Sequence, residues 1–370
     1  MKRIVISILC LAGILLAGCA APAQISPETT AAATAPTECP TEPTTDIVET
    51  TEAPTLPEPE PTEYVLSFVG DCCLANLKGW SKDAYFMGTV GEDYAYPFAG
   101  VKEYFEADEC TFINLENPLT ERGSAAGNPF VFRGPPVYTR ILTEGSVEFA
   151  NVVNNHAMDY GEEGYLDTLA ALDEAGIRYA EQKQTLVFTT ENGLTIGIYT
   201  DLHPQKAEGF SEKVASLRDQ GAEIVIFCFH WGQEYFYKPN SLQTELGHAA
   251  IDAGADIVYG HHSHILQPVE EYGSGVIFYS LGNFCFGGNT NPDDKDSAFL
   301  QQTVIREPDG TVHLGELTRI PCCLSSVQTH NDFQPTPYDP ESAEYLRTLS
   351  KLDGSWEKTQ LSASNRPELG

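Results

Sequence analysis

The chain has 370 residues, which is enough for one large domain or two of ordinary size. It holds 53 acidic and 21 basic residues, and its formal net charge of −32 argues against a nucleic-acid partner and against direct binding to anionic lipid. Ten cysteines are present, but several lie in apolar strand-like runs or in adjacent pairs, so the sequence does not determine the disulfide state or which cysteines would pair.

Residues 1–19 are typical of a bacterial lipoprotein signal peptide. Lys2 and Arg3 precede an apolar run over residues 4–16 that is too short to span a bilayer comfortably. Leu-Ala-Gly-Cys at residues 16–19 then matches a lipobox, which predicts cleavage before Cys19 and lipidation of that cysteine. We therefore expect lipidated Cys19 to anchor the protein to the bacterial cell membrane, on its extracytoplasmic face. The alternative is an ordinary signal peptide followed by an incidental cysteine.

Residues 20–63 form a segment rich in Pro, Thr, Ala and Glu. It contains nine acidic residues and no Lys or Arg, so it cannot bury a core and is predicted to be a disordered, extended stalk. The remaining head, residues 64–370, then has 44 acidic and 19 basic residues, a net charge of about −25.

The sequence pattern changes at Tyr64, where apolar runs typical of strands begin to alternate with patterns typical of helices. Strands are predicted at residues 64–71, 110–116 and 147–153, a helix over residues 162–176, and a hairpin around Asn192-Gly193. Two helix–Gly–strand units follow at residues 212–232 and 241–264, and later strands lie near 276–286, 298–307 and 311–321. The pattern predicts an α/β fold with mixed sheets over residues 64–327. Beyond it, residues 328–370 are expected to form a loosely structured C-terminal extension with one helix.

Most of these predicted strands end in polar residues that can bind a metal ion. Because ligand sites in open α/β sheets gather at the carboxyl ends of strands, we expect these side chains to converge. Carboxylate, amide and imidazole groups together suit Zn, Mn or Fe. The strand-end residues are Asp71, Glu116, Asn155, His156, His230, His262 and His264.

The order of these residues resembles the calcineurin-like metallophosphoesterases, and more closely the CapA family of poly-γ-glutamate capsule proteins. The stretches "FVGDCCL", "INLENPLT", "FRGPP", "VNNHAMDYGEEGYLDTLAALDEAGI", "HWGQEY", "GADIVYGHHSHILQPVEEY" and "VIFYSLGNF" match the family pattern between residues 64 and 286. The resemblance implies a metallophosphoesterase-like, four-layer αββα sandwich of mixed sheets. It also implies a part in the synthesis, export or processing of poly-γ-glutamate, with capsule machinery as partners.

Site roles follow from the resemblance, residue by residue. It implies one or two divalent ions: Asp71 and His264 would hold the first, Asn155, His230 and His262 the second, and Glu116 would bridge the two. His156 would be the catalytic histidine and Asp159 would orient it. Cys73 stands where the wider superfamily has a histidine ligand, which places the first metal position in question.

Several further residues have a functional and a structural interpretation. Arg133 in "FRGPP" is predicted to bind a substrate carboxylate or phosphate. His203 is ambiguous, His261 is expected to pack or to contact the ligands, and Asn154 is expected to be a turn residue.

The expected function is a role in poly-γ-glutamate synthesis, export or processing, as a divalent-metal-dependent hydrolase that uses a metal-bound hydroxide. Its electrophile would be a phosphate ester or a γ-linked amide, and the motifs do not separate the two. One alternative is a non-catalytic, membrane-tethered scaffold that handles the polymer and keeps a structural metal. The other is a general phosphoesterase unrelated to capsule.

Overall fold

The computed structural model describes residues 59–362. The signal peptide, Cys19 and most of the stalk lie outside the described residues, so the predicted membrane anchor stays a prediction. The first strand, β1 (Thr62–Cys73), starts two residues before the boundary predicted at Tyr64. Within the described part of the chain, every helix is too short or too polar to cross a bilayer.

The first sheet has seven strands in the order β15-β14-β13-β1-β3-β5, with β12 also paired to β1. β1 runs parallel to β3 and β12 and antiparallel to β13, while β3 runs parallel to β5. Its other strands are β3 (Cys110–Leu115), β5 (Phe149–Asn151), β12 (Asn283–Phe286), β13 (Asp296–Arg306), β14 (Val312–Cys323) and β15 (Thr336–Pro337).

The second sheet has six strands in the order β10-β11-β9-β8-β7-β6. Its four central strands are parallel, and the two edge strands are antiparallel to their neighbours. The strands are β6 (Thr185–Thr189), β7 (Thr195–Leu202), β8 (Ile224–His230), β9 (Ile257–His261), β10 (Val269–Tyr272) and β11 (Gly275–Phe278). A separate ribbon pairs β2 (Asn76–Leu77) with β4 (Phe132–Arg133).

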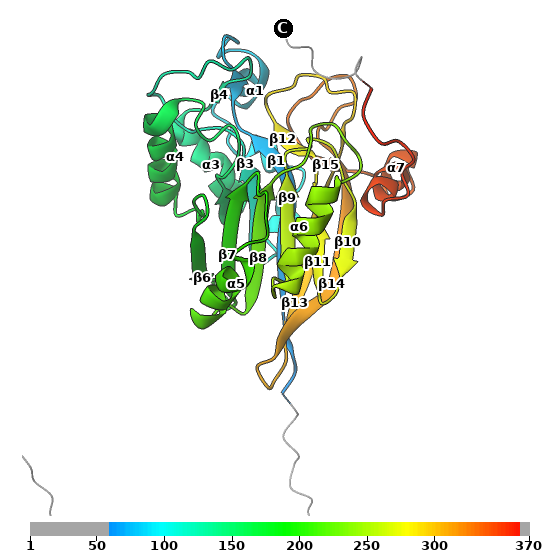
Figure 1. Cartoon of the computed structure of the whole chain (residues 1–370). Coiled ribbons are helices and arrows are strands. Elements are labelled where there is room, and N and C mark those ends of the chain that lie inside the picture. The colour runs from blue at the N-terminus through cyan, green and yellow to red at the C-terminus, as the bar shows by residue number, and fades with distance from the viewer. Residues whose placement is uncertain (1–58, 363–370) are drawn as a thin grey trace, which may run out of the picture. The chain divides into compact units, whose positions relative to one another are not determined.

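Helices cover the outer faces of both sheets (Figure 1). The helices are α1 (Tyr85–Val90), α2 (Lys102–Phe105), α3 (Thr139–Glu144), α4 (Gly161–Ala175), α5 (Phe210–Asp219), α6 (Ser241–Asp252) and α7 (Ala343–Leu352), with 3-10 turns at Tyr96–Phe98 and Pro136–Tyr138.

Three hydrophobic cores separate four layers. Phe68 and Phe112 of the first sheet and Ile226 of the second belong to one core between the sheets. A second core packs helices α1 to α4 on the outer face of the first sheet, and a third packs α5 and α6 on the second. The predicted four-layer αββα sandwich is confirmed.

Local signals in the sequence explain several of these elements. Asn192-Gly193 turns the antiparallel pair β6 and β7, and Gly193 has the positive φ of 94° that glycine favours. α6 begins with a capping box between Asn240 and Gln243. α4 ends at Gly176, which is left-handed with a φ of 73°, as predicted.

The C-terminal segment is folded into the head, so the expectation of a loosely structured extension is wrong for residues 328–362. Phe333 and Leu352 are buried in separate cores, β15 extends the first sheet, and Lys351 of α7 makes buried ion pairs with Asp294 and Asp296. Sequence periodicity missed this because the segment is mostly loop and is held by single anchoring side chains.

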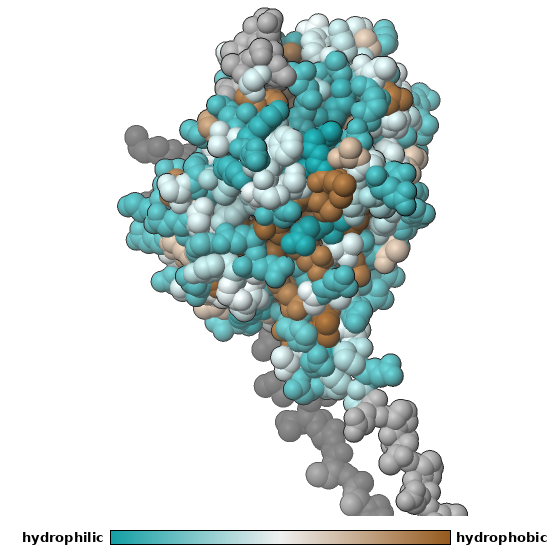
Figure 2. Space-filling view, turned by 90° about the vertical axis from the view of Figure 1, so that its right-hand side faces the viewer, coloured by the Kyte–Doolittle hydropathy of each residue, from teal (hydrophilic) through white to brown (hydrophobic). Residues whose placement is uncertain are grey.

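The face of the molecule near α7 is mainly hydrophilic, with hydrophobic residues gathered through its middle (Figure 2).

Candidate metal centre

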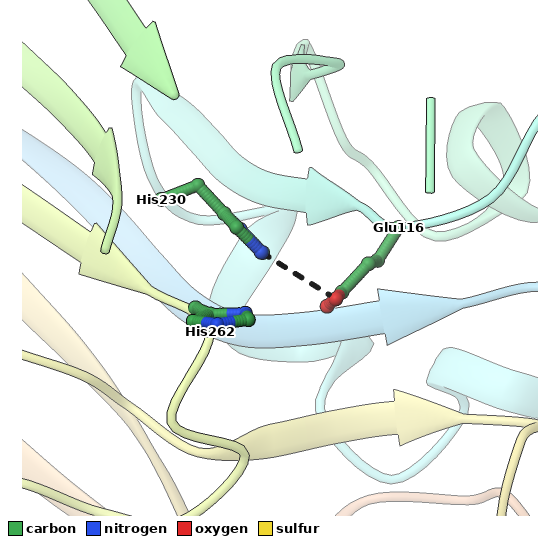
Figure 3. A group of neighbouring side chains, drawn as sticks. All are labelled: Glu116, His230 and His262. Carbon is green, nitrogen blue, oxygen red and sulfur yellow. Dashed lines mark ion pairs between the residues drawn. The ribbon is translucent and has the colours of Figure 1, made fainter. Parts of the chain in front are cut away.

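Candidate ligands lie at the carboxyl ends of strands from both sheets. Asp71 is near the end of β1 and Glu116 directly follows β3, while His230 ends β8 and His262 directly follows β9. β1 is parallel to β3 in the first sheet, and β8 is parallel to β9 in the second, so the carboxyl ends of each pair lie at one edge of their sheet. Figure 3 shows Glu116, His230 and His262 pointing toward one another from three different strand ends.

These residues form two overlapping groups with Glu116 in common. One group is Glu116, His230 and His262, and the other is Asp71, Glu116 and His264; within each, one potential ligand atom per residue lies within 4.8 Å of the others. Glu116 Oε1 is 3.6 Å from His230 Nε2 and 3.8 Å from His264 Nε2. The structure therefore brings together five of the six residues predicted to bind metal.

The donor atoms of the centre fit a bound cation. Glu116 Oε1, both ring nitrogens of His230 and His262 Nδ1 are buried without a hydrogen-bond partner. Buried polar groups are rarely left unpaired in a native protein, because the loss of hydration is costly. A divalent ion would satisfy these atoms, and neutral imidazole with carboxylate is a common donor set for one.

Asp71 is held by a network around both of its oxygens. Asn114 Nδ2 donates to Oδ1 at 2.9 Å, His261 Nδ1 is 3.1 Å from Oδ1, and His264 Nδ1 is 3.2 Å from Oδ2. The preceding Gly70 is required because a Cβ there would lie 2.1 Å from the carbonyl oxygen of Gly282. His261 thus contacts a candidate ligand, as its sequence position suggested.

Burial and neighbouring charges shift the pKa values of the candidate ligands. Burial raises the pKa of Glu116 well above its usual range, and the nearby Asp71 charge raises it further. Burial lowers the pKa of His230 strongly and that of His262 to about 3, so both are neutral, the form that binds metal. Burial opposes protonation of His264 as well, but Glu116 and Asp71 raise its pKa to about 10.

The opposing carboxylate, Asp71, has its pKa shifted the other way. Burial alone would raise it, but the hydrogen bonds from His261 and His264 hold the pKa well below the ordinary value. Asp71 is therefore ionised at neutral pH and available as an anionic ligand.

The backbone around the centre is unusual. His262 and His264 have positive φ angles of 93° and 59°, and the neighbouring His203 and Tyr235 have φ angles of 50° and 65°. Residues with a side chain rarely adopt such angles, and the cost of order 1–3 kcal/mol each is tolerated mainly at functional sites. The conformation after β9 brings two imidazoles of one short turn into the centre.

His156 and Asp159 form a buried pair beside the candidate ligands. His156 Nδ1 is 2.9 Å from Asp159 Oδ2, and the same oxygen accepts the backbone N–H of Phe132 at 2.7 Å. Because a carboxylate only accepts, the pair favours a proton on Nδ1 and leaves Nε2 free. His156 and His264 line one cavity of about 50 Å³ together with Glu234.

The two asparagines before His156 have different environments. Asn154 is buried, donates from Nδ2 to the Leu115 carbonyl at 2.8 Å, and accepts the His156 backbone N–H at Oδ1. These contacts fit the turn role expected for Asn154. Asn155, the sixth predicted ligand, has an exposed side chain, so its place in the metal centre stays a prediction.

Cys73 packs in an apolar cluster with Ala75, Phe132 and Phe286 instead of joining either ligand group. Burial raises the pKa of its thiol well above the ordinary value, which disfavours the thiolate that binds metal. The seven cysteines among residues 59–362 are all buried and unpaired.

Sequence reasoning missed Glu234 and left His203 undecided. Glu234, in "HWGQEY", forms a third group with His262 and His264, whose ligand atoms lie within 4.8 Å of one another. The ring centroid of His203 is 5.2 Å from that of His262. His203 follows β7, so its position at a strand end was the available signal, whereas nothing local distinguishes Glu234 from a surface acid.

The family model for bacterial capsule synthesis protein PGA_cap matches residues 65–288. The chain belongs to the PGA_cap family. Among its relatives, the PGA biosynthesis protein CapA of Bacillus subtilis (strain 168) is 35% identical over 297 residues, covering 68% of this chain and 77% of that protein. The capsule biosynthesis protein CapA of Bacillus anthracis is 30% identical over 244 residues, covering 58% of this chain and 59% of that protein. The resemblance noted in the sequence is thus confirmed for PGA_cap.

The solved structures similar to this PGA_cap protein include a phosphoesterase and a nucleotidase. The calcineurin-like phosphoesterase YfkN from Bacillus subtilis aligns with 14% identity and a TM-score of 0.44, covering 74% of this chain and 94% of that one. The NAD nucleotidase NadN of Haemophilus influenzae aligns with 13% identity and a TM-score of 0.41, covering 82% and 65%.

Proposed function

We propose that this protein is a divalent-metal-dependent hydrolase that processes poly-γ-glutamate during capsule formation, tethered through lipidated Cys19 to the extracytoplasmic face of the membrane. Membership in the PGA_cap family supports the polymer, since relatives carry capsule and PGA biosynthesis in their names. The electrophile would be a γ-linked amide of the polymer.

One observation carries the hydrolase proposal: unpaired ligand atoms of Glu116, His230 and His262 converge beside the His156–Asp159 pair. A structural metal site is usually closed and needs no such pair. A divalent ion held by Asp71, Glu116, His230, His262 and His264 would polarise the scissile group and lower the pKa of a coordinated water.

His156 has the environment of a general acid. Asp159 fixes the ring through Nδ1, and the ring of Phe132 meets it edge-on, with centroids 4.8 Å apart. The free Nε2, when protonated, would donate a proton to the leaving nitrogen as the carbon–nitrogen bond breaks. Hydrolysis would then add the hydroxyl to the carbonyl carbon and the proton to the amine.

The test compares native full-length protein with His156→Ala on γ-glutamyl oligomers in the presence of Mn²⁺, Zn²⁺ or Fe²⁺. The native protein should release new amino termini, and His156→Ala should lose about 10²- to 10⁴-fold in kcat. Bound metal per chain, measured by elemental analysis, should be the same in both proteins. A His156→Ala variant with undiminished turnover would remove His156 from the mechanism.

A non-catalytic scaffold is the second candidate, and the burial of Cys73 in an apolar cluster favours it, since one ligand position of the wider superfamily is lost. The two candidates differ in cells. If His156→Ala retains its metal and still supports capsule formation in a strain lacking the native gene, the scaffold is correct. A native protein that cleaves phosphodiesters but no γ-glutamyl oligomer would instead be a general phosphoesterase.

A further inference from the structure

A second pocket, distinct from the metal centre, lies next to β4. Its volume is about 410 Å³, within the range of small-ligand sites, and its wall includes Lys78, Trp80, Lys82, Arg133 and Tyr160. The β2–β4 ribbon forms part of this wall, with Asn76 paired to Arg133.

The pocket is positive on a strongly negative head. Lys78, Lys82 and Arg133 line it, and Glu121 is the single acidic side chain in its wall. Residues 64–370 have a net charge of about −25. Three cations gathered in one hollow therefore stand out from the surrounding surface, and clefts lined by one sign of charge concentrate ligands of the other sign.

The cations of this pocket are poorly neutralised by the protein itself. Within residues 59–362, neither Lys78 nor Arg133 forms an ion pair with a carboxylate, and Lys82 Nζ is 3.9 Å from Glu121 Oε2 with both side chains largely exposed. Arg122 nearby is different, because Asp167 and Glu163 pair with it. A chain with more than two acidic residues for every basic one has thus left Arg133 free for another anion.

Arg133 is also held in place. Its guanidinium lies over the ring of Tyr160, 4.3 Å from the centroid. Stacking restrains the guanidinium plane, so less entropy is lost when two of its N–H groups bind one carboxylate.

The backbone joins the pocket to the proposed acid. Phe132, next to Arg133, donates its N–H to Asp159 and contacts the ring of His156. Tyr160, which stacks on Arg133, directly follows Asp159. Arg133 and Tyr160 of the pocket are therefore the sequence neighbours of Phe132 and Asp159, which both contact the ring of His156.

We propose that this pocket is a subsite for the carboxylates of a γ-glutamyl chain, which holds the polymer beside the metal centre. The proposal rests on the proposed function for its ligand. Arg133 would bind one carboxylate through two hydrogen bonds, and Lys78 and Lys82 would attract its neighbours. A bound polymer would thus be held at points that the metal centre does not contact.

Binding is measured by fluorescence anisotropy of a labelled γ-glutamate decamer with the full-length protein at 150 mM salt. Arg133→Gln should weaken binding roughly 10- to 100-fold, because a charge-assisted pair is lost. Lys78→Gln, at an exposed position, should weaken it roughly two- to fivefold. Arg140→Gln is the matched control, since Arg140 stacks on Tyr94 at the same 4.3 Å but outside the pocket, and it should bind as the native protein does.

The outcomes separate the subsite from the hydrolase. If Arg133→Gln and Lys78→Gln both bind the decamer as tightly as the native protein does, and both keep the native thermal midpoint, the subsite is overturned. This holds even if the native protein cleaves the polymer. Arg133-dependent binding without cleavage supports the subsite and contradicts the hydrolase. Displacement of the decamer by millimolar inorganic phosphate, with no displacement by γ-glutamyl tripeptide, overturns the assignment to carboxylates.

Discussion

The carboxylate of Glu116 lies where the two groups of candidate ligands overlap, and it is completely buried. Burial and the neighbouring charge of Asp71 make this carboxylate harder to ionise, so its pKa is raised well above the ordinary value. With a cation it would ionise and bind. Single side chains in this centre therefore have properties that make sense only as parts of a set.

Asp159→Asn tests the positioning role of that carboxylate. Asparagine keeps an acceptor for the Phe132 N–H but carries no charge to hold His156, so kcat on γ-glutamyl oligomers should fall roughly 10- to 100-fold. KM and bound metal should change little, because Asp159 is in neither ligand group. A 10- to 100-fold rise in KM with no change in kcat would show that Asp159 acts on substrate binding instead.

At the scale of elements, α7 is fixed to the sandwich by buried charges. Lys351 Nζ is 2.6 Å from Asp294 Oδ2 and 2.8 Å from Asp296 Oδ2, and Arg347 pairs with Asp296 at 2.6 Å. Lys351 is 3% exposed. Replacing both partners of such a pair by apolar residues often changes the stability of the protein little. Removing only one partner is costly, because it leaves a buried charge uncompensated.

Lys351→Ala should therefore lower the free energy of unfolding by about 3–5 kcal/mol. The measurement is urea denaturation followed by tryptophan fluorescence, with Trp356 close to Lys351. Lys102→Ala, in an exposed pair with Glu106, is the control and should change stability by less than about 0.5 kcal/mol. A Lys351→Ala protein as stable as the control would mean that α7 does not need this anchor.

The segment before β3 holds a carboxylate whose burial opposes ionisation. Burial raises the pKa of Asp108 to about 7, although Ser67 and Thr111 hydrogen-bond it, and Glu148 and Glu109 add repulsion. The folded state thus binds this proton more tightly than the unfolded chain, so the contribution of Asp108 to stability declines as pH rises from about 4 to about 7.

Asp108→Asn should remove that decline while keeping an acceptor for the Thr111 hydroxyl. Each unit of pKa shift corresponds to about 1.4 kcal/mol, so the variant should gain stability relative to native protein at pH 8 and little at pH 4. Unfolding in urea at both pH values checks this. A gain of the same size at both pH values would contradict the titration of Asp108.

At the scale of the whole molecule, strand β1 runs from near the start of the described residues to the candidate metal centre. The strand starts at Thr62, toward the bottom of Figure 1, and Asp71 lies nine residues further along it. At about 3.3 Å per residue, the two are about 30 Å apart. The start of β1 and the candidate metal centre therefore lie near opposite ends of this strand.

Cys19→Ala tests the tether. If Cys19 is lipidated as we propose, the variant should move from the membrane fraction to the soluble fraction or medium, because it could no longer carry that lipid. Fractionation followed by immunoblotting measures this, and metal content of the released protein should be unchanged. Retention of Cys19→Ala in the membrane fraction would mean that another segment holds the protein.

The sequence by itself determined the strand-ending residues, their order and an α/β fold with mixed sheets, and the family resemblance added the αββα sandwich. The convergence of those residues was predictable because parallel strands bring their carboxyl ends to one edge. The sequence also pointed to the His156–Asp159 pair, because the family resemblance assigned His156 and Asp159 follows three residues later. Tertiary structure alone decided that Glu234 faces His262 and His264, that Cys73 packs among aromatic rings, and that α7 is docked by Lys351. The physical reason is that these contacts join segments far apart in the chain, where neither periodicity nor local turn chemistry carries information about which side chains meet.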